Sequence, residues 1–365
     1  MFPLIIRICE FARGSAAPPG QPPRGRKERY NTLVTAPGRQ GPGKGHSAMR
    51  TRSAISTLVA TLALASLALA SAQDFSPPLP ASPAEIAQSV QHAQPPSDAE
   101  FRERTDKLIA HQHADDIAIE EFERIERHVD RTGGSNQRIL EDKTFRVVPT
   151  GPGTLKILLQ DNGKATDPTD YRKQLLAWRD LLQLALNPSD SRIKAAYAKT
   201  EKKKRDRAEL VNAARDAFSL KWVGRENLNG HDCDLVLLDP NPAFHPRTTL
   251  QEALTHANAK IWVDHNALQI LRAEAHIVRD VSFGGGILGK LYRGGVFFLE
   301  QAEVAPGVWL PARYQYDYTA RKFLFTSEQH QFIEASHYRR LGPPKQALLV
   351  AQNELASGKP VPADP

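Results

Sequence analysis

Cysteine is nearly absent from this sequence: among 365 residues there are two, Cys9 and Cys233. Cys9 lies in an N-terminal region that we expect to be removed, so the remaining protein has one thiol and can form no internal disulfide. Cys233 alternates with Leu235 and Leu237, which predicts a small buried residue on one face of a strand and not a nucleophile. The fold must therefore be stable without an internal disulfide.

The sequence also lacks a typical membrane-spanning run. Its most apolar stretch, 55–70, has about 16 residues, whereas a span needs about 20. Basic residues precede this stretch and the small residues Ala70-Ser71-Ala72 follow it. A basic start, a short apolar centre and a small-residue exit predict a secretory signal peptide over residues 49–72.

A net positive charge is missing from the part that remains after cleavage. We expect Met49 to be the true start, which makes residues 1–48 an upstream mis-called or disordered segment. The whole chain carries a net charge of +7, but residues 1–72 hold ten basic and two acidic residues, which leaves −1 from Gln73 onward. The charge balance therefore gives no reason to expect a nucleic-acid partner. We expect export to the periplasm or, alternatively, to the medium.

Changes in hydrophobic periodicity divide the mature chain into regions. Residues 98–132 are predicted to be helical because Phe122, Ile125 and Val129 recur at a spacing of three to four. The other predicted regions are a Pro-rich linker at 73–97, a β domain at 133–342 with a helical insertion at 169–217, and a C-terminal tail at 343–365.

Two helices are predicted inside the β domain, over about 169–186 and 191–217. The first has one strong apolar face that includes Trp178 and Leu182. After Phe218, short runs in which apolar and polar residues alternate, together with the hairpin signal Asn229-Gly230, predict an antiparallel sheet of roughly eight to ten strands. The predicted fold class is α+β, mainly antiparallel β: a curved unclosed β-barrel (half-barrel) with helices packed on the concave face, plus an N-terminal helix.

Several short motifs have an ordinary explanation. Residues 284–290 fit glycine-rich phosphate loops, but a strand follows them where those loops require a helix, so we predict a loop or a strand kink. His111 and Asp115 lie four apart but lack a third ligand, which favours solvated surface over a metal site. No Ser-His-Asp order is recognisable. We therefore predict no catalytic residue, no metal and no cofactor.

One basic run remains in the mature chain, formed by Lys202, Lys203, Lys204 and Arg205 on the second predicted helix. Acidic residues surround it, which favours a solvated helix face. The alternative is contact with an anionic membrane surface or with an acidic partner.

Four segments between 220 and 320 resemble a known family. They are the strand 233–238 that ends in Asp239-Pro240, the strand Lys260-Ile261-Trp262-Val263-Asp264, the segment Leu271-Arg272-Ala273-Glu274, and the segment Gly307-Val308-Trp309-Leu310-Pro311. Their order is similar to that of the outer-membrane lipoprotein-sorting (LolA/LolB-like) superfamily. The resemblance implies a half-barrel that binds acyl chains or other apolar ligands, and it transfers no catalytic residue. The long helices at 169–217 and the charged segment at 98–131 depart from the family pattern.

These features together predict an exported non-enzymatic protein that binds an apolar ligand, a lipid or a lipid-modified protein, in its half-barrel. An envelope interaction module with a filled core is the alternative, and a secreted hydrolase is a third. Since an apolar concave face must be covered or filled, aromatic and leucine side chains from the helix and the strands are the expected lining: Trp178, Leu182, Trp222, Trp262, Phe297 and Trp309.

Overall fold

The computed structural model describes residue 90 and residues 93–133, 137–283, 286–287 and 289–358. The predicted upstream segment, the signal peptide and most of the linker at 73–97 lie outside the described residues. No helix within the described part of the chain is long and apolar enough to cross a membrane.

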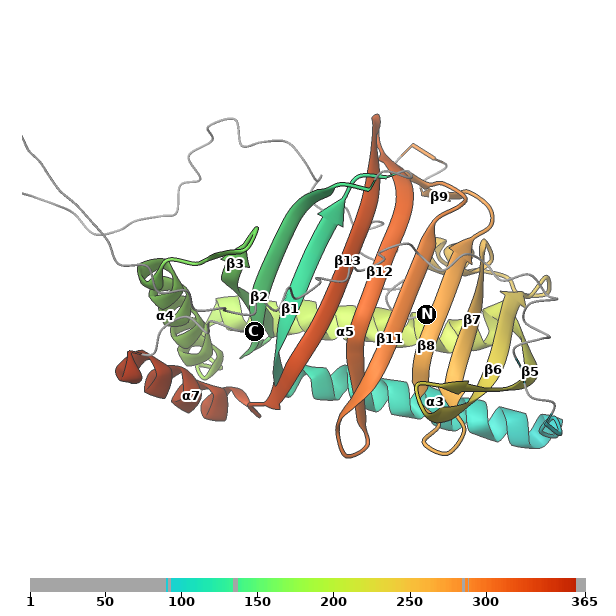
Figure 1. Cartoon of the computed structure of the whole chain (residues 1–365), viewed down its shortest axis with the longest axis horizontal. Helices are drawn as coiled ribbons and strands as arrows, with labels where there is room; N and C mark the ends of the chain where they lie inside the picture. The colour runs from blue at the N-terminus through green and yellow to red at the C-terminus, as the bar shows by residue number, and fades with distance from the viewer. Residues whose placement is uncertain (1–89, 91–92, 134–136, 284–285, 288, 359–365) are drawn as a thin grey trace, which may run out of the picture. The chain divides into compact units, whose positions relative to one another are not determined.

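The architecture is one large antiparallel sheet of 13 strands that arches over two long helices (Figure 1). Along the sheet the order is β4-β3-β2-β1-β13-β12-β11-β8-β7-β6-β5, and the short strands β10 and β9 extend it beside β12. Because the two ends of this order do not pair in the described structure, the barrel is unclosed, as predicted. The strands are β1 (Phe122–Arg131), β2 (Ile139–Gly151), β3 (Gly153–Asp161), β4 (Lys164–Ala165), β5 (Phe218–Leu228), β6 (His231–Pro240), β7 (Ala257–Asp264), β8 (Ile270–Ile277), β9 (Val281–Phe283), β10 (Gly289–Leu291), β11 (Val296–Ala305), β12 (Val308–Lys322) and β13 (Phe325–Arg340).

Period-two alternation builds both faces of this sheet. In β6, Val236 and Leu238 belong to the cluster on the concave side, while Cys233 and Leu235 belong to a separate cluster on the opposite side. The β5–β6 hairpin turns at Asn229-Gly230, where both residues have positive φ (54° and 90°), as the sequence predicted.

The helices are α3 (Asp98–Ala118), the short 3₁₀ helix η1 (Ile119–Glu121), α4 (Pro168–Ala185), α5 (Ser191–Ala217), α6 (Thr249–Leu254) and α7 (Pro344–Ser357). The side chains of Asp167 and Asp190 cap α4 and α5, which places both helices where the sequence predicted them. Helices α3 and α5 run along the concave side of the sheet (Figure 1).

Helices α4 and α7 cover a different face. They pack on Ile125 of β1 and Val148 of β2. His128, three residues after Ile125, lies opposite Ile333 of β13 and so shares its face, and Ile333 belongs to the concave cluster. Since successive strand residues point to opposite faces, α4 and α7 lie on the side away from α3 and α5. The prediction of helices on the concave face therefore holds for α5, and α4 is an addition on the other face.

Two segments differ from the sequence-based prediction. The helix predicted for 98–132 ends at Ala118, and β1 begins at Phe122. Ile125 and Val129 misled the prediction because a spacing of four keeps residues on one face in a strand as well as in a helix. The predicted C-terminal tail is also wrong for its first part, since Pro344–Ser357 forms α7 and buries Ala347 and Ala351 against α4.

Candidate functional site

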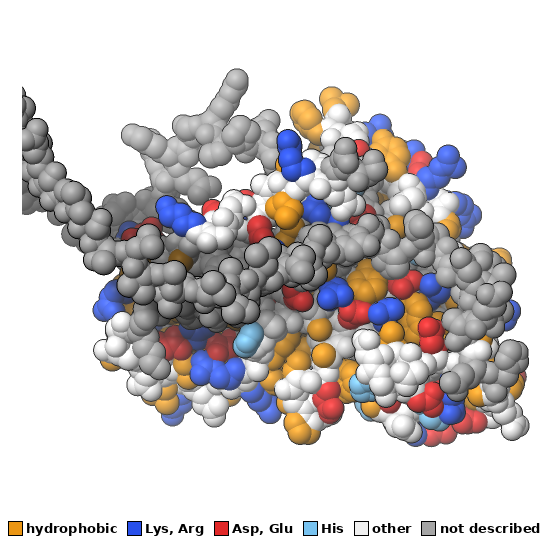
Figure 2. All heavy atoms as spheres, in the orientation of Figure 1, with side chains coloured by type: hydrophobic (Ala, Val, Ile, Leu, Met, Phe, Trp, Pro, Cys, Tyr) orange, Lys and Arg blue, Asp and Glu red, His pale blue; other side chains and the backbone are white. Residues whose placement is uncertain are grey.

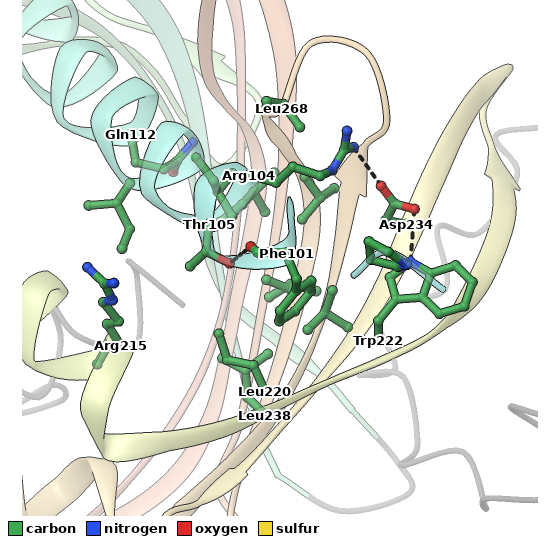
Figure 3. Close-up of a pocket in the computed structure, with 18 of the residues that line it drawn as sticks. Phe101, Arg104, Thr105, Gln112, Arg215, Leu220, Trp222, Asp234, Leu238 and Leu268 are labelled. Carbon is green, nitrogen blue, oxygen red and sulfur yellow. Dashed lines mark hydrogen bonds and ion pairs between the residues drawn. The ribbon is translucent and has the colours of Figure 1, made fainter. Parts of the chain in front are cut away.

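A cavity lies between α3, α5 and the concave side of strands β5 to β8 (Figure 3). Its space is about 850 Å³, which includes the part open to solvent. Apolar side chains dominate the wall: Phe101, Leu108, Ile109, Val211, Ala214, Leu220, Trp222, Val236, Leu238, Ile261, Val263, Leu268 and Ile270.

Regular periodicity brings these side chains together. On α3, Phe101 and Leu108 lie seven residues apart, which is about two turns, so they share one face of the helix. On α5, Val211 and Ala214 share a face in the same way. The sheet contributes alternate residues of each strand, and adjacent strands continue the same apolar surface.

A polar network closes one end of the cavity. Arg104 of α3 donates to Asp234 Oδ2 (2.8 Å), and Trp222 Nε1 donates to Asp234 Oδ1 (2.9 Å) (Figure 3). Burial alone would raise the pKa of Asp234, but the hydrogen bonds of Trp222 and His265 and the charge of Arg104 hold it below its usual value. Asp234 is therefore an ionised carboxylate that ties α3 to the strands.

His265, in the turn after β7, completes this network. Arg225 Nη2 lies 2.7 Å from His265 Nε2, and His265 Nδ1 lies 2.9 Å from Asp234 Oδ2. Arg104 Nη2 lies 3.0 Å from the same Nδ1 atom, so two arginines and one carboxylate surround the imidazole. Arg104 also donates to the backbone carbonyl of His265 (2.7 Å). The network thus ties the turn after β7 to α3 and to β5.

Further along α3, a buried polar group lies beside the cavity. The Asp115 side chain is 5% exposed, and its Oδ1 accepts from the backbone N–H of Trp309 (3.1 Å). Its Oδ2 is buried and has no hydrogen-bond partner in the described structure. Burial raises the pKa of Asp115 to about 6. Gln112 donates to Gln269 (3.0 Å) next to it, so several polar contacts hold α3 on the sheet.

Of the six side chains predicted to line a ligand site, Trp222 lines this cavity. Trp178 and Leu182 do not, because α4 buries both completely in the cluster with α7 on the other face of the sheet. Trp178 Nε1 donates there to the carbonyl of Pro149 (2.8 Å), and the Arg146 guanidinium lies 5.2 Å from the centre of its ring.

The three remaining predicted residues do not line the cavity. Trp262 and Trp309 join Cys233 in the cluster on the opposite side of the sheet. Phe297 belongs to the concave cluster and stacks on Tyr318, with ring centres 5.5 Å apart. Sequence analysis missed the α3 contribution, although the spacing of Phe101 and Leu108 on a charged helix was a signal for it.

The described lining of the cavity contains no activated nucleophile: its one hydroxyl, that of Thr105, donates to the carbonyl of Phe101 (2.8 Å). Burial raises the pKa of Cys233 to about 12, so this thiol is not activated. Among the described residues, His265 receives no hydrogen bond from a hydroxyl or thiol, and no group of three His, Cys, Asp or Glu could hold a metal ion.

Two motifs from the sequence take definite positions. His111 Nδ1 lies 3.0 Å from the carbonyl of Leu268, and Asp115 is buried, so the prediction of solvated surface for this pair is wrong. The packing of α3 on the β7–β8 turn, which the sequence did not reveal, is the reason. The glycine-rich motif joins β9 to β10, and strands flank it on both sides, although Gly284, Gly285 and Leu288 lie outside the described residues.

The basic run on α5 is partly neutralised. Lys202 pairs with Asp206 (3.2 Å), and Lys204 pairs with Glu120 (2.7 Å) and Glu201 (3.0 Å). Lys203 and Arg205 are exposed. Contact of this run with an anionic membrane surface stays a prediction.

Comparison with known proteins adds three solved structures of low similarity. No protein-family model matches the sequence, and no curated protein matches it. A putative outer membrane lipoprotein-sorting protein domain from Vibrio parahaemolyticus is 10% identical, with a TM-score of 0.29 and coverage of 69% of this chain and 99% of that one. A LolA superfamily protein from Nitrosomonas europaea is 11% identical, with a TM-score of 0.28 and coverage of 67% and 96%. A DUF1329 family protein from Desulfovibrio piger is 12% identical, with a TM-score of 0.26 and coverage of 66% and 92%.

Two of these names agree with the family that the sequence motifs resemble. At this identity and TM-score, the matches transfer neither a ligand nor a partner to this chain. The geometry of the cavity therefore carries the functional argument.

Proposed function

We propose that this chain is an exported carrier that holds an apolar ligand, the acyl chain of a lipid or of a lipid-modified protein, in the cavity between α3, α5 and strands β5 to β8. The observation that carries the proposal is an open cavity whose wall is apolar, in a protein whose other helix layer is tightly filled. Apolar walls left in contact with water cost free energy that an apolar ligand recovers on binding.

The polar network at one end gives the proposed ligand an orientation. The indole of Trp222 borders the cavity, and Arg104, Arg225 and His265 surround the carboxylate of Asp234. A ligand with an apolar chain and a polar end would place the chain along α5 and the polar end toward this network. Export, which rests on the predicted signal peptide at 49–72, would expose such a carrier to lipids of the cell envelope.

Titration with a fluorescent fatty-acid probe tests the proposal. Leu108→Trp adds an indole to the wall of the cavity and should weaken the binding of the probe at least about tenfold, since a side chain then occupies the ligand space. Leu181→Trp is the matched control, because Leu181 is a half-exposed leucine of α4 on the other helix layer.

The parent protein must also bind the probe. Loss of binding in Leu108→Trp alone, together with an acyl species that native mass spectrometry finds on the parent purified from its own envelope, would support the carrier. A parent that binds neither probe nor lipid would favour an interaction module with no ligand.

A further inference from the structure

The hairpin that joins β12 to β13 ends in an apolar tip. These are the longest strands of the described sheet, with 15 and 16 residues, and the turn Phe323-Leu324 connects them. At this tip the side chains of Phe323, Leu324 and Phe325 are 54%, 91% and 80% exposed. The hairpin rises above the neighbouring strands in Figure 1, and apolar atoms are visible at the corresponding upper edge in Figure 2.

Local folding does not explain these residues. Two-residue hairpin turns favour Asn and Gly, because the turn needs positive φ and faces water. Here Phe323 has φ of 52°, a region that is unfavourable for a bulky side chain. Strain and exposure at one turn both weigh against these residues, so local folding leaves their presence at the tip unexplained.

One more exposed apolar side chain lies in the adjacent turn. Ile287 is 76% exposed in the connection between β9 and β10. β10 pairs with β12 next to the tip, with Gly289 opposite Lys322, and Arg321 Nη2 donates to the carbonyl of Gly286 (3.1 Å). We call Ile287, Phe323, Leu324 and Phe325 the apolar tip.

Basic side chains lie behind the apolar tip. Arg321 and Lys322 precede the turn, and Lys290 lies opposite Arg321 on β10. Arg293 is exposed just after β10. Asp280 pairs with Lys290 (2.7 Å), and Glu328 of β13 is the other nearby acid, so basic groups outnumber acidic ones. Apolar residues in front and positive charge behind match the acyl region and the anionic headgroups of a membrane surface.

We propose that the apolar tip inserts into the interfacial region of a bilayer that contains anionic lipid and so docks this protein on a membrane. Ile287, Phe323, Leu324 and Phe325 enter the boundary between headgroups and acyl chains. The exposed Arg293 faces phosphate groups, and the charges of the half-buried Arg321 and Lys322 add positive potential behind the tip. The surface is separate from the cavity and from the basic run of α5, so it can act whether or not the cavity binds a ligand.

Vesicle flotation tests this surface with a variant that should fold at least as well as the parent. Phe323→Asn places at 323 a residue that tolerates the positive φ found there, and together with Leu324→Gly it removes two exposed apolar side chains. With vesicles of phosphatidylethanolamine and phosphatidylglycerol, we expect the parent to float. The double variant should partition at least about tenfold more weakly, because it lacks two apolar side chains whose transfer from water into the bilayer favours binding. Leu349→Gln removes an exposed leucine of α7 and should float like the parent.

A reporter separates insertion from loose adsorption. Leu324→Trp places an indole at the tip, whereas Trp178, Trp262 and Trp309 are buried. Vesicles with brominated acyl chains should quench additional fluorescence in this variant. Equal flotation of the parent and the Phe323→Asn/Leu324→Gly variant would overturn the proposal, as would a parent that does not float. Tip-dependent self-association without flotation, seen by analytical ultracentrifugation, would also overturn it.

Discussion

Two helix layers cover this sheet, and they differ in how completely their side chains fill the space against it. Against β2 and β3, α4 and α7 enclose a filled cluster in which Trp178, Leu182 and Leu159 have no exposed surface. Against β5 to β8, α3 and α5 leave an open cavity. Both layers present apolar helix faces to the same sheet, so an apolar face alone does not decide between a core and a ligand site.

The size and placement of the side chains decide whether a helix layer forms a filled core or a ligand site. α4 directs Tyr171, Leu175 and Trp178 into its cluster, whereas α5 presents the smaller Val211 and Ala214 to the cavity. Polar groups differ in the same direction. The buried Arg146 beside the filled cluster is matched by two carboxylates, Glu123 (2.6 Å) and Glu354 (2.6 Å), but Asp115 beside the cavity has one carboxylate oxygen without a partner.

Hollowing the filled layer should have the largest effect on stability. Trp178→Ala removes a fully buried indole and its hydrogen bond to Pro149. We expect the free energy of unfolding to fall by about 3 to 5 kcal/mol, because contacts are lost and a cavity remains. Urea denaturation measures the change.

The same variant tests whether the two layers are independent. Affinity for the fatty-acid probe should stay within about twofold of the parent in folded Trp178→Ala, since additive behaviour is expected for distant sites. Trp222→Ala is the matched comparison, because it should lower the affinity for the probe and reduce the free energy of unfolding less than Trp178→Ala does. A large loss of probe binding in Trp178→Ala would support the sequence-based prediction that Trp178 belongs to the ligand site.

Much of this fold could be predicted from periodicity. The 3.6-residue pattern located α4 and α5, and the alternation after Phe218 predicted an open antiparallel sheet. The pattern failed where two periods coincide, at Ile125 and Val129, because a spacing of four fits a strand and a helix alike. It also failed at α7, whose buried side is made of the small residues Ala347 and Ala351.

The site was harder to predict than the fold. Tryptophan content guided the expected lining, but a tryptophan fills a core as readily as it lines a cavity, and Trp178 does the former. Which face of the sheet each helix covers depends on strand register, and a shift of one residue would move every side chain of a strand to the other face. The Arg104–Asp234 pair joins residues 130 positions apart, so no local motif revealed it.

The carboxylate of Asp115, which has one oxygen without a partner, predicts a pH dependence. The pKa of Asp115 is about 6 in the folded protein, above its ordinary value of 3.8. The folded state therefore binds this proton more tightly than the unfolded state, so this group lowers stability as the pH rises from about 4 to about 6. Asp115→Asn cannot ionise and should be more stable than the parent by roughly 1 to 3 kcal/mol at pH 8, with little difference at pH 4.

A carboxylate with the opposite shift is the control for this pH series. The pKa of Asp234 is held below its usual value, so its ionised form stabilises the fold, and that stability is lost as the pH falls through the lowered pKa. Asp234→Asn should therefore destabilise the protein at neutral pH. Thermal unfolding at several pH values would contradict the assignment if both variants changed stability in the same direction.

The smallest effect should come from loosening α3 over the cavity. Arg104→Gln removes the charged bond to Asp234 but leaves that carboxylate with Trp222 and His265. We expect a stability loss of about 1 kcal/mol, because the arginine is partly exposed and the remaining partners stay. Hydrogen exchange should nevertheless speed up in α3 and stay unchanged in α4, and the fatty-acid probe should dissociate faster. Since α3 forms one wall of the cavity and α4 touches none of it, equal acceleration in both helices would mean that the two layers open together and that α3 is not a separate cover for the cavity.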